Sequence, residues 1–522
     1  MLFVAALSLL VLSFSYADPL WVRTFSGPSA NYDEIHAIGV DSAGNVVVSG
    51  ESYVADEDEE LVTIKYRPDG DTAWLRHFNP GTGLDGATAL AVDRAGNTIV
   101  TGYAGSQTLE YGDWVTIKYS PSGESLWSAT YDFGDQDRPT AVAVDSAGNS
   151  YVTGRAGRQD DLDIIVVKYD PLGNEVWRFR YDGGSDEIPW ALAVDKQGNA
   201  YVTGQTMRGT GDLALVIWKL GLGGESLWAN VYAGPAGSHM RGLAVATDDW
   251  DNVVVAGSSY DTLTFGDYLT VKYGPNGDTL WARRYNGPGN RGDQVQGLAI
   301  DRAGNVYVTG TSAIDAQGHY NCATVKLSPD GVQRWLARYI GPRYYDRACG
   351  LVLDAEANVY VAGSSVNSNG DWDVVTLKYD SSGNKRWAER FDMPSTYDEA
   401  YVMALSSQGN LYVAGRTEGD TSGIDYLLLC YGTAGGLAER GSVEARSERT
   451  EAIIARGVLW LQPGSNRGTQ GAGLQDICGR EVMRLWPGAN NVSELSPGVY
   501  FITESAGHSR QTPCVTRVIL TR

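Results

Sequence analysis

The sequence of 522 residues contains few of the residues from which metal centres and nucleophilic active sites are commonly built. It has five cysteines and five histidines, without a Cys-x-x-Cys pair or a zinc-type histidine spacing. It has no Gly-x-Ser-x-Gly motif and no adjacent cysteines. The histidines are scattered over different repeats and domains: His36, His77, His239, His319 and His508. Sulfur-bound metal and serine-hydrolase chemistry therefore have no support in the sequence.

Long apolar runs and an excess of positive charge are also missing. After residue 17, no stretch of about eighteen uninterrupted apolar residues could form a membrane-spanning helix. The chain carries 41 basic and 63 acidic residues, a net charge of -22, and this field repels nucleic-acid phosphates and anionic lipid headgroups. We therefore expect no nucleic-acid partner, no binding to membrane surfaces and no transmembrane segment in the mature chain.

The first seventeen residues are typical of a secretory signal peptide. An apolar run from Leu2 to Phe14 is too short to span a bilayer and precedes Ser15-Tyr16-Ala17, a small-x-small cleavage pattern. No Lys or Arg precedes the run, so a buried N-terminal strand is the alternative. We expect a mature chain that begins at Asp18, reaches the periplasm, and is secreted or displayed on the cell surface.

The five cysteines are too few to form the main scaffold of an exported protein. They are Cys322, Cys349, Cys430, Cys478 and Cys514. Their odd number leaves at least one thiol unpaired, and Cys478 with Cys514 is the pairing to test first.

Glycine and aromatic residues are abundant, with 64 Gly, 15 Trp and 30 Tyr, and they occur in a repeat of about fifty residues. A turn asparagine, usually in Asp-x-x-Gly-Asn, marks each copy: Asn45, Asn97, Asn149, Asn199, Asn252, Asn305, Asn358 and Asn410. A tryptophan follows the same period: Trp21, Trp74, Trp127, Trp177, Trp228, Trp281, Trp335 and Trp387. Both markers indicate eight copies.

Each copy contains four apolar runs of strand length bounded by turn residues. Four strands in about fifty residues predict one blade of a β-propeller. The fold class is therefore all-β, an eight-bladed β-propeller over residues 18–431. The first predicted strand contains Trp21, the tryptophan that normally ends a repeat. The last repeat ends at the strand of residues 427–431 and has no tryptophan strand after it. We expect the N-terminal strand to complete the eighth blade.

The repeats resemble the bacterial tandem β-propeller repeats of the SBBP type. The resemblance rests on Asp-x-x-Gly-Asn-x-Tyr-Val-Thr-Gly followed by Lys-Tyr-x-Pro-x-Gly-x-x-x-Trp, and it covers about residues 21–431. Blade five departs at Asp248–Asn252, and blade eight has Cys430 in place of the repeated lysine. The resemblance implies a propeller and export, but no single activity, because propellers include binding proteins and enzymes.

A second domain follows the repeats. Residues 432–456 are expected to form a linker, with few large apolar residues between 434 and 450. Residues 457–522 resemble the C-terminal sorting domain of type IX secretion substrates, through Asp476-Ile477-Cys478-Gly479-Arg480-Glu481-Val482 and Leu495-Ser496-Pro497-Gly498-Val499-Tyr500. The resemblance implies a small β-sandwich that the outer-membrane secretion machinery reads. A β-sandwich without an export role is the alternative.

Variable loops lie on one face of the predicted disc, where binding groups usually sit. On this face an acid precedes each innermost strand except in blade five: Asp33, Asp85, Asp137, Glu187, Asp293, Asp346 and Asp398. A second set precedes the third strands: Glu60, Asp113, Asp163, Asp267, Asp373 and Asp425. The inner set could bind calcium around the channel mouth. The simpler interpretation is that the inner acids accept hydrogen bonds from backbone N–H groups. The five aspartates of the second set are candidates for ligand binding.

Three other repeated features have structural interpretations. Asp-x-x-Gly-Asn is expected to form a hairpin turn and not a calcium loop. The lysines are expected to pack by their stems with solvated ammonium groups: Lys65, Lys118, Lys168, Lys219, Lys272, Lys326 and Lys378. The tryptophans are expected to pack between blades, although a sugar platform is the alternative.

The leading hypothesis is a secreted, non-enzymatic propeller that binds a glycan, another extracellular polymer or a protein through its loop face. The second hypothesis is a lyase or glycosidase that uses carboxylates near the channel, with or without calcium. The third is a structural surface-layer component. No cofactor other than calcium is suggested.

Overall fold

The computed structural model describes most of residues 19–432 and seven strands beyond them. The gaps before residue 432 are 29–31, 56–57, 81–82, 107–111, 134–135, 159–160, 261–264, 394–396 and 420–422. The expected signal peptide, Cys478 and Cys514 lie outside the described residues. The chain divides into two units, Met1–Ala434 and Gly435–Arg522. No helix in the described part is long and apolar enough to cross a membrane.

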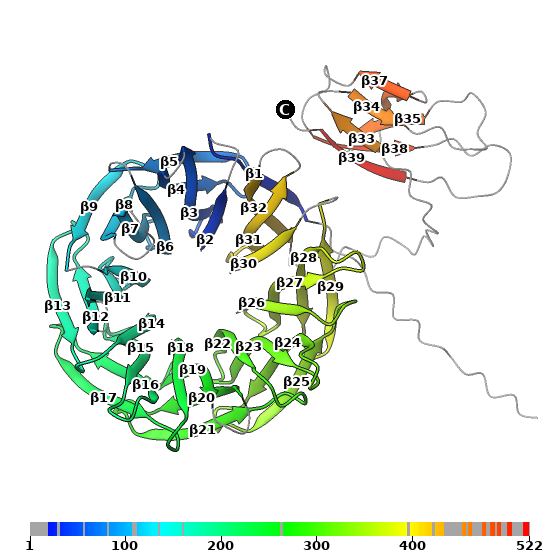
Figure 1. Ribbon diagram of the computed structural model, residues 1–522. Helices are drawn as coiled ribbons and strands as arrows, with labels where there is room; N and C mark the ends of the chain where they lie inside the picture. Colours follow the sequence, from blue (N-terminus) through cyan, green and yellow to red (C-terminus); the bar gives the residue numbers. More distant parts are fainter. Residues whose placement is uncertain are drawn as a thin grey trace, which may run out of the picture. The chain divides into compact units, whose positions relative to one another are not determined.

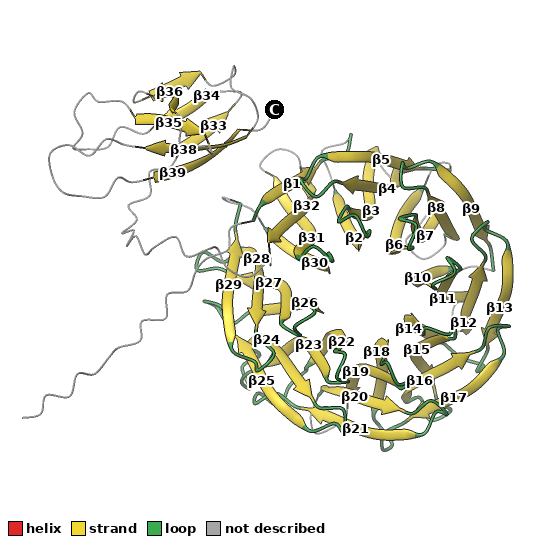
Figure 2. Cartoon of the chain, turned by 180° about the vertical axis from the view of Figure 1, so that it is seen from behind, coloured by secondary structure: helices red, strands yellow, loops and turns green. Residues whose placement is uncertain are grey.

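The first unit is a ring of eight four-stranded antiparallel sheets, as the repeat predicts (Figures 1 and 2). From the channel outward, blades 1 to 4 are β2(Asp33–Val40) β3(Val46–Ala55) β4(Asp58–Tyr66) β5(Thr72–Phe78); β6(Leu84–Val92) β7(Thr98–Ser106) β8(Asp113–Tyr119) β9(Ser125–Tyr131); β10(Arg138–Val144) β11(Ser150–Arg158) β12(Asp161–Tyr169) β13(Glu175–Tyr181); and β14(Glu187–Val194) β15(Ala200–Met207) β16(Leu213–Leu220) β17(Ser226–Tyr232).

Blades 5 to 8 have the same order and complete the ring. They are β18(His239–Thr247) β19(Val253–Tyr260) β20(Asp267–Tyr273) β21(Thr279–Tyr285); β22(Gln294–Ile300) β23(Val306–Ala313) β24(Tyr320–Leu327) β25(Gln333–Tyr339); β26(Asp346–Leu353) β27(Val359–Val366) β28(Trp372–Tyr379) β29(Lys385–Phe391); and β30(Asp398–Leu405) β31(Asn410–Gly419) β32(Gly423–Gly432) β1(Trp21–Phe25).

The N-terminal strand closes the eighth blade, which confirms the expectation from the sequence. β1 pairs antiparallel with β32, so that Trp21 lies opposite Cys430 and Phe25 opposite Tyr426. Because both ends of the propeller segment share one sheet, this blade leaves no unpaired β32 edge at the point where the ring closes.

The repeated Asp-x-x-Gly-Asn segments form hairpin turns, as expected. In the first of them, Asp41 Oδ1 accepts hydrogen bonds from the backbone N–H groups of Ala43 and Asn45, at 3.0 and 2.9 Å. Gly44 has a φ of 85°, a conformation that glycine adopts without steric cost. The turn therefore uses the aspartate as a backbone acceptor.

The repeated lysines correct one expectation, because their ammonium groups are not all solvated. In blades 1, 2 and 5 the lysine Nζ forms an ion pair with the turn aspartate, and these lysines are 2–3% exposed. The pairs are Lys65–Asp41 at 2.8 Å, Lys118–Asp93 at 3.0 Å and Lys272–Asp248 at 2.9 Å. A buried charge needs such a partner, so these lysines belong to the internal structure of the blade.

In four other blades, a tyrosine contacts both the turn aspartate and the lysine. The tyrosine hydroxyl donates to the turn aspartate at 3.0–3.2 Å, in the pairs Tyr151–Asp145, Tyr201–Asp195, Tyr307–Asp301 and Tyr360–Asp354. The lysine Nζ then lies 4.8–5.2 Å from the centre of the tyrosine ring, in a cation–π contact. Blades with an aliphatic residue at the tyrosine position, such as Val47 and Ile99, are the ones with the direct ion pair.

The tryptophans join neighbouring blades, which confirms the packing interpretation. Seven of the eight repeated indole N–H groups donate to a carbonyl in the outer turn of the next blade, at 2.8–3.2 Å. The pairs are Trp21–Pro68, Trp74–Pro121, Trp127–Pro171, Trp177–Leu222, Trp228–Pro275, Trp281–Pro329 and Trp335–Ser381. The first of these pairs connects the closing strand of blade 8 to blade 1. We call this contact the Trp clamp.

A glycine in the same outer turn makes room for the clamp. At Gly123, φ is 85° and an added Cβ would lie 2.7 Å from Cγ of Trp74. In addition, Arg76 Nε donates to the carbonyl of Gly123 at 2.6 Å. The Pro-x-Gly turn therefore provides a carbonyl acceptor and a surface without a side chain for the indole.

A β-bulge interrupts every innermost strand. In blade 1 the pairing shifts between Ile35 and Ala37, which leaves His36 as the extra residue. The glycine opposite is required there, because a Cβ on Gly50 would lie 1.8 Å from the carbonyl oxygen of Glu34. A bulge redirects the side chain of its extra residue. The bulge residues are His36, Thr88, Thr140, Trp190, Leu243, Gln296, Cys349 and Tyr401.

The second unit contains two antiparallel sheets. One has the order β33(Ala452–Ala455) β34(Val458–Leu461) β37(Gly488–Asn491), and the other has the order β36(Glu481–Leu485) β35(Ala472–Asp476) β38(Gly498–Thr503) β39(Val515–Leu520). β33 lies within residues 432–456, which the sequence predicts to be a linker.

We expect Gly123→Ala to destabilise the propeller more than Gly237→Ala. Both glycines have a positive φ, 85° and 83°, but nothing lies within 4 Å of a Cβ on Gly237. The left-handed conformation should therefore cost both variants about 1 kcal/mol or more. Overpacking against Trp74 should cost Gly123→Ala a further 1–3 kcal/mol, roughly. Denaturant midpoints of the two variants measure this difference, and equal midpoints would contradict the role of the Trp clamp.

Candidate functional site

The seven acids at the start of the innermost strands are buried acceptors for loop backbone groups. They are 0–2% exposed. Backbone N–H groups donate to six of them from the preceding loop and to Asp85 from Gly105: Gly27–Asp33, Gly105–Asp85, Phe133–Asp137, Gly183–Glu187, Gly287–Asp293, Gly341–Asp346 and Met393–Asp398. Blade five has the buried Met240 at this position. The hydrogen bonds match the backbone-acceptor interpretation, and calcium binding by this set stays a prediction.

Burial raises the pKa of these carboxyl groups where a shift is resolved. It raises the pKa of Asp137 and of Asp398 to about 6, against hydrogen bonds that lower it. The same cause raises the pKa of Asp33, Glu187, Asp293 and Asp346. The loop acceptors are therefore protonated more readily than exposed carboxylates.

Three of the six acids in the second set pair with an arginine of a fourth strand, and another contacts a histidine there. Arg180 lies 2.5 Å from Asp163, Arg284 3.9 Å from Asp267, and Arg390 2.7 Å from Asp373. Glu60 contacts His77 at 2.6 Å. Asp113 is exposed, and Asp425 lies beside Ile424 of a pocket described below. Ligand binding by these acids stays a prediction.

The central channel contains a pocket of about 400 Å³ between the innermost strands. Most of its lining is apolar, from residues such as Leu90, Leu298 and Val402. Five of its lining residues are bulge residues: His36, Thr88, Gln296, Cys349 and Tyr401. The bulges therefore determine which side chains face the channel, and these side chains differ from blade to blade.

A cluster of ionisable residues from blades 1, 2, 3 and 8 lies beside this pocket. We call it the rim cluster. It consists of Glu34, His36, Glu51, Tyr103, Arg138, Glu399, Tyr401 and Arg416. His36 Nε2 lies 3.5 Å from Glu51 Oε1, and the Tyr103 hydroxyl donates to Glu51 Oε2 at 2.7 Å. Arg138 lies over the Tyr103 ring, 5.0 Å from its centre.

Arg416 connects the rim cluster to blade 8. Its Nη2 lies 2.6 Å from Glu399 and its Nη1 lies 3.4 Å from Glu34. The Tyr401 hydroxyl donates to Glu399 Oε2 at 2.8 Å. The cluster therefore links the strand starts of blades 1 and 8, at the junction where the ring closes.

The two glutamates of blade 1 have pKa values shifted in opposite directions. Burial raises the pKa of Glu34, although His36 and Arg416 oppose the shift. Burial also disfavours the charged form of Glu51, but His36, Tyr103 and Arg138 together hold its pKa below the usual value. Burial lowers the pKa of His36, yet the hydrogen bond and charge of Glu51 raise it above the usual value overall. Paired carboxyl groups with separated pKa values occur at acid–base sites.

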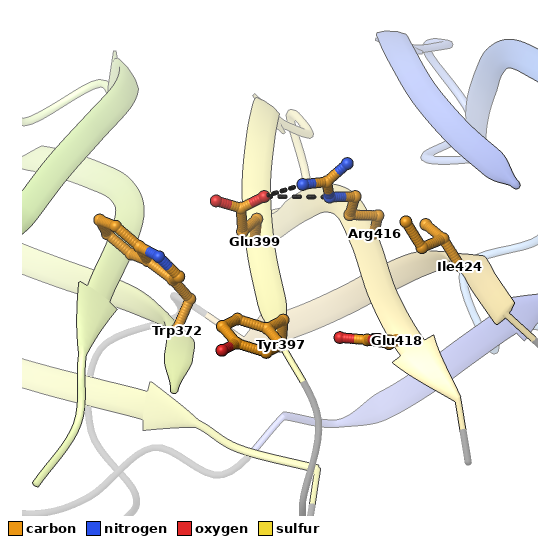
Figure 3. Close-up of a pocket in the computed structure, with 6 residues that line it drawn as sticks. All are labelled: Trp372, Tyr397, Glu399, Arg416, Glu418 and Ile424. Carbon is orange, nitrogen blue, oxygen red and sulfur yellow. Dashed lines mark hydrogen bonds and ion pairs between the residues drawn. The ribbon is translucent and has the colours of Figure 1, made fainter. Parts of the chain in front are cut away.

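A second pocket of about 260 Å³ lies between blades 7 and 8 (Figure 3). It is lined by Trp372, Tyr397, Glu399, Arg416, Glu418 and Ile424. Figure 3 shows the Arg416 guanidinium joined to Glu399 by two hydrogen bonds, with the rings of Trp372 and Tyr397 nearby. Aromatic surface beside a few oriented polar groups is characteristic of a small-molecule site.

The rim cluster is not predicted from the sequence, because its residues do not recur from blade to blade. His36 is one of five scattered histidines, and the candidate acids are the repeated ones. A signal was present in the differences between blades: the residues after the repeated acid position are Glu34, Gly86, Arg138, Ile188, Arg241, Gln294, Arg347 and Glu399. Residues that recur in every blade stabilise the blade. Residues that differ between blades can bind a ligand or take part in a reaction.

Comparisons with known proteins support a β-propeller repeat protein. The family model of the β-propeller repeat matches residues 133–157 and 280–315. No curated protein sequence matches the chain. Among solved structures, Sqt1 from Chaetomium thermophilum is 12% identical, covers 80% of this chain and 99% of its own, and has a TM-score of 0.50.

Two polysaccharide lyases are also among the matching structures. The polysaccharide lyase Uly1 is 12% identical, with 76% of this chain and 90% of that chain covered, at a TM-score of 0.43. An ulvan lyase is also 12% identical, with 79% and 94% covered, at 0.40. At these identities the comparisons concern the fold alone.

We expect Asp137→Asn to change how stability depends on pH. A raised folded pKa contributes stability that is fully present below the unfolded pKa, near 3.8, and is lost as the pH rises through about 6. Relative to the wild type, the variant should therefore be more stable at pH 7.5 than at pH 4, by about 1–3 kcal/mol. Thermal unfolding at both pH values measures the difference.

The same variant separates this account from calcium binding. If the inner acids only accept backbone hydrogen bonds, adding calcium to the metal-free protein should leave the midpoint unchanged. A saturable rise with calcium that Asp137→Asn and Asp346→Asn abolish would establish the metal role and overturn the acceptor interpretation.

Proposed function

We propose that this propeller is a secreted or cell-surface protein that binds a glycan or a related extracellular polymer in the pocket between blades 7 and 8. The observation that carries the proposal is the combination of two aromatic rings, Trp372 and Tyr397, with the Arg416–Glu399 pair in one pocket. Aromatic rings can stack on the apolar faces of sugars, while the ion pair offers donors and acceptors for hydroxyl groups.

The exposure and position of the pocket support a polymer ligand. Tyr397 is 45% exposed, and Trp372 also contacts Arg347, whose Cζ lies 4.9 Å from the centre of the ring. Arg416 belongs both to this pocket and to the rim cluster. A chain bound at the pocket could therefore extend along the strand starts toward the channel, where Tyr401 and His36 line the next pocket.

The C-terminal unit would serve as the export signal. The support is the resemblance of residues 457–522 to type IX sorting domains, together with the strands β35 and β38, which contain parts of both motifs. We propose that the two sheets form the expected β-sandwich and that the outer-membrane machinery reads it. In a bacterium with this system, deletion of residues 457–522 should leave the protein in the periplasm, and unchanged export would contradict the role.

A catalytic role is the second candidate, because the rim cluster contains two carboxyl groups at close range. Ligand atoms of Glu34 and Glu51 lie within 4.8 Å of each other, and their pKa values are shifted in opposite directions. One protonated and one ionised carboxyl group are the requirements of a glycosidase pair. A lyase or glycosidase acting on the bound polymer would use these residues.

We expect Trp372→Ala to weaken polymer binding at least tenfold, since it removes one of the two aromatic surfaces of the pocket. Loss of an aromatic stacking surface corresponds to about 1–3 kcal/mol. Trp250→Ala is the matched control, because Trp250 is 56% exposed in the Asp248–Asn252 turn of blade 5. Isothermal titration against neutral and acidic polysaccharides measures both variants.

The outcomes separate the hypotheses. Binding that falls in Trp372→Ala and not in Trp250→Ala supports the pocket. Equal binding by both variants, or no binding by the wild type, would contradict it and favour a protein partner or a structural role. Release of reducing ends or unsaturated products by the wild type, lost in Glu51→Gln, would establish the enzyme.

A further inference from the structure

Three ligand-type side chains converge in the part of the rim cluster that belongs to blade 1. Glu34 and His36 are on β2, and Glu51 is on the neighbouring β3. One ligand atom from each lies within 4.8 Å of the other two. Among the residues that the structure describes, this is the group of His, Cys, Asp and Glu side chains that meets this spacing. None of the seven repeated acids belongs to it.

The separation of His36 from Glu51 fits two ligands of one ion. Nε2 of His36 and Oε1 of Glu51 are 3.5 Å apart, which is long for a hydrogen bond between a ring nitrogen and a carboxylate. Two ligands that each bind zinc at about 2.0–2.1 Å in tetrahedral geometry are separated by about 3.3 Å. Small side-chain adjustments would therefore complete the coordination.

Neighbouring residues hold both carboxylates by their other interactions. The Tyr103 hydroxyl donates to Oε2 of Glu51, while Oε1 faces His36. The Tyr32 hydroxyl donates to Oε2 of Glu34. Metal-binding carboxylates are commonly held in this way by hydrogen bonds from surrounding residues, which fix their orientation. The arrangement leaves a defined oxygen of Glu51 directed at the histidine.

The electrostatics favour a dication at this position. Glu34 and Glu51 are both largely buried, with side chains 12% exposed, and like charges at such range repel. Arg416 is nearer to Glu399, at 2.6 Å, than to Glu34, at 3.4 Å. A divalent ion between the two glutamates would neutralise both without displacing the Arg416–Glu399 pair.

The bulge leaves an open side for exchange and for a further ligand. His36 is the extra residue of the β2 bulge and lines the channel pocket, with 33% of its side chain exposed. An ion can therefore enter from the channel and retain a water molecule on that side. Three protein ligands with one open position are typical of catalytic zinc sites.

The geometry points to a divalent transition-metal site of the zinc class formed by Glu34, His36 and Glu51 at the wall of the central channel. An imidazole ligand favours zinc, cobalt or nickel over calcium, which takes oxygen ligands. This site differs in residues and in chemistry from a calcium site at the repeated acids. It also does not depend on polymer binding at Trp372, so that either can be present without the other.

Cobalt and zinc titration of the purified full chain without a histidine tag tests the site. We expect one equivalent of Co²⁺ to bind with the visible absorption of a four- or five-coordinate ion, to be displaced by Zn²⁺, and not to be displaced by millimolar Ca²⁺. His36→Gln and Glu51→Gln should each weaken cobalt binding at least tenfold. Circular dichroism establishes that both variants are folded.

His319→Gln is the matched control. His319 forms the comparable pair with Asp315 at 2.5 Å in blade 6, and its side chain is similarly exposed at 37%. Cobalt binding should be unchanged in this variant. Absence of stoichiometric binding, binding that survives in folded Glu51→Gln and His36→Gln, or loss of binding in His319→Gln would overturn the proposal. Because the readout is cobalt absorption, a failed polymer titration leaves this result unaffected.

Discussion

The Trp clamp between neighbouring blades is the contact on which the rest of the structure depends. Each β-sheet of four strands has two faces and cannot bury both within itself, so that it requires neighbours on either side. The indole ring packs over the next blade and its N–H group is satisfied by a carbonyl there, for example Trp74 with Pro121. The clamp between Trp21 and Pro68 extends this contact across the closure, where the N-terminal strand pairs with β32.

A ring held in this way allows the positions near the channel to vary. Glycines such as Gly50 permit the bulge, and in five blades the bulge residue lines the channel pocket. That residue is histidine in blade 1, threonine in blade 2 and tyrosine in blade 8. The packing of the blade does not depend on the identity of this bulge residue. Ionisable side chains can therefore gather on a few blades. The rim cluster at the junction of blades 1 and 8 is such an accumulation.

The sequence predicted the number of blades, the closure and the packing role of the tryptophans, because these features follow from residues that recur with one period. It failed for the lysines, because solvation of an ammonium group depends on neighbours such as Asp41 and Tyr151 that meet only in the folded blade. It also missed His36, since a bulge shifts the alternation of inward and outward residues and no repeated residue marks that shift.

Residues that hold the ring are distinct from residues that form the site, and the unfolding midpoints of two variants test this separation most directly. One variant carries Glu34→Gln, His36→Thr and Glu51→Gln, and the other carries Trp74→Phe. We predict that the first variant is at least as stable as the wild type without added metal, because functional sites concentrate groups unfavourable to folding. Trp74→Phe should lose about 1 kcal/mol or more, since it removes the partly buried indole hydrogen bond to Pro121. A large loss in the first variant with none in the second would contradict the account.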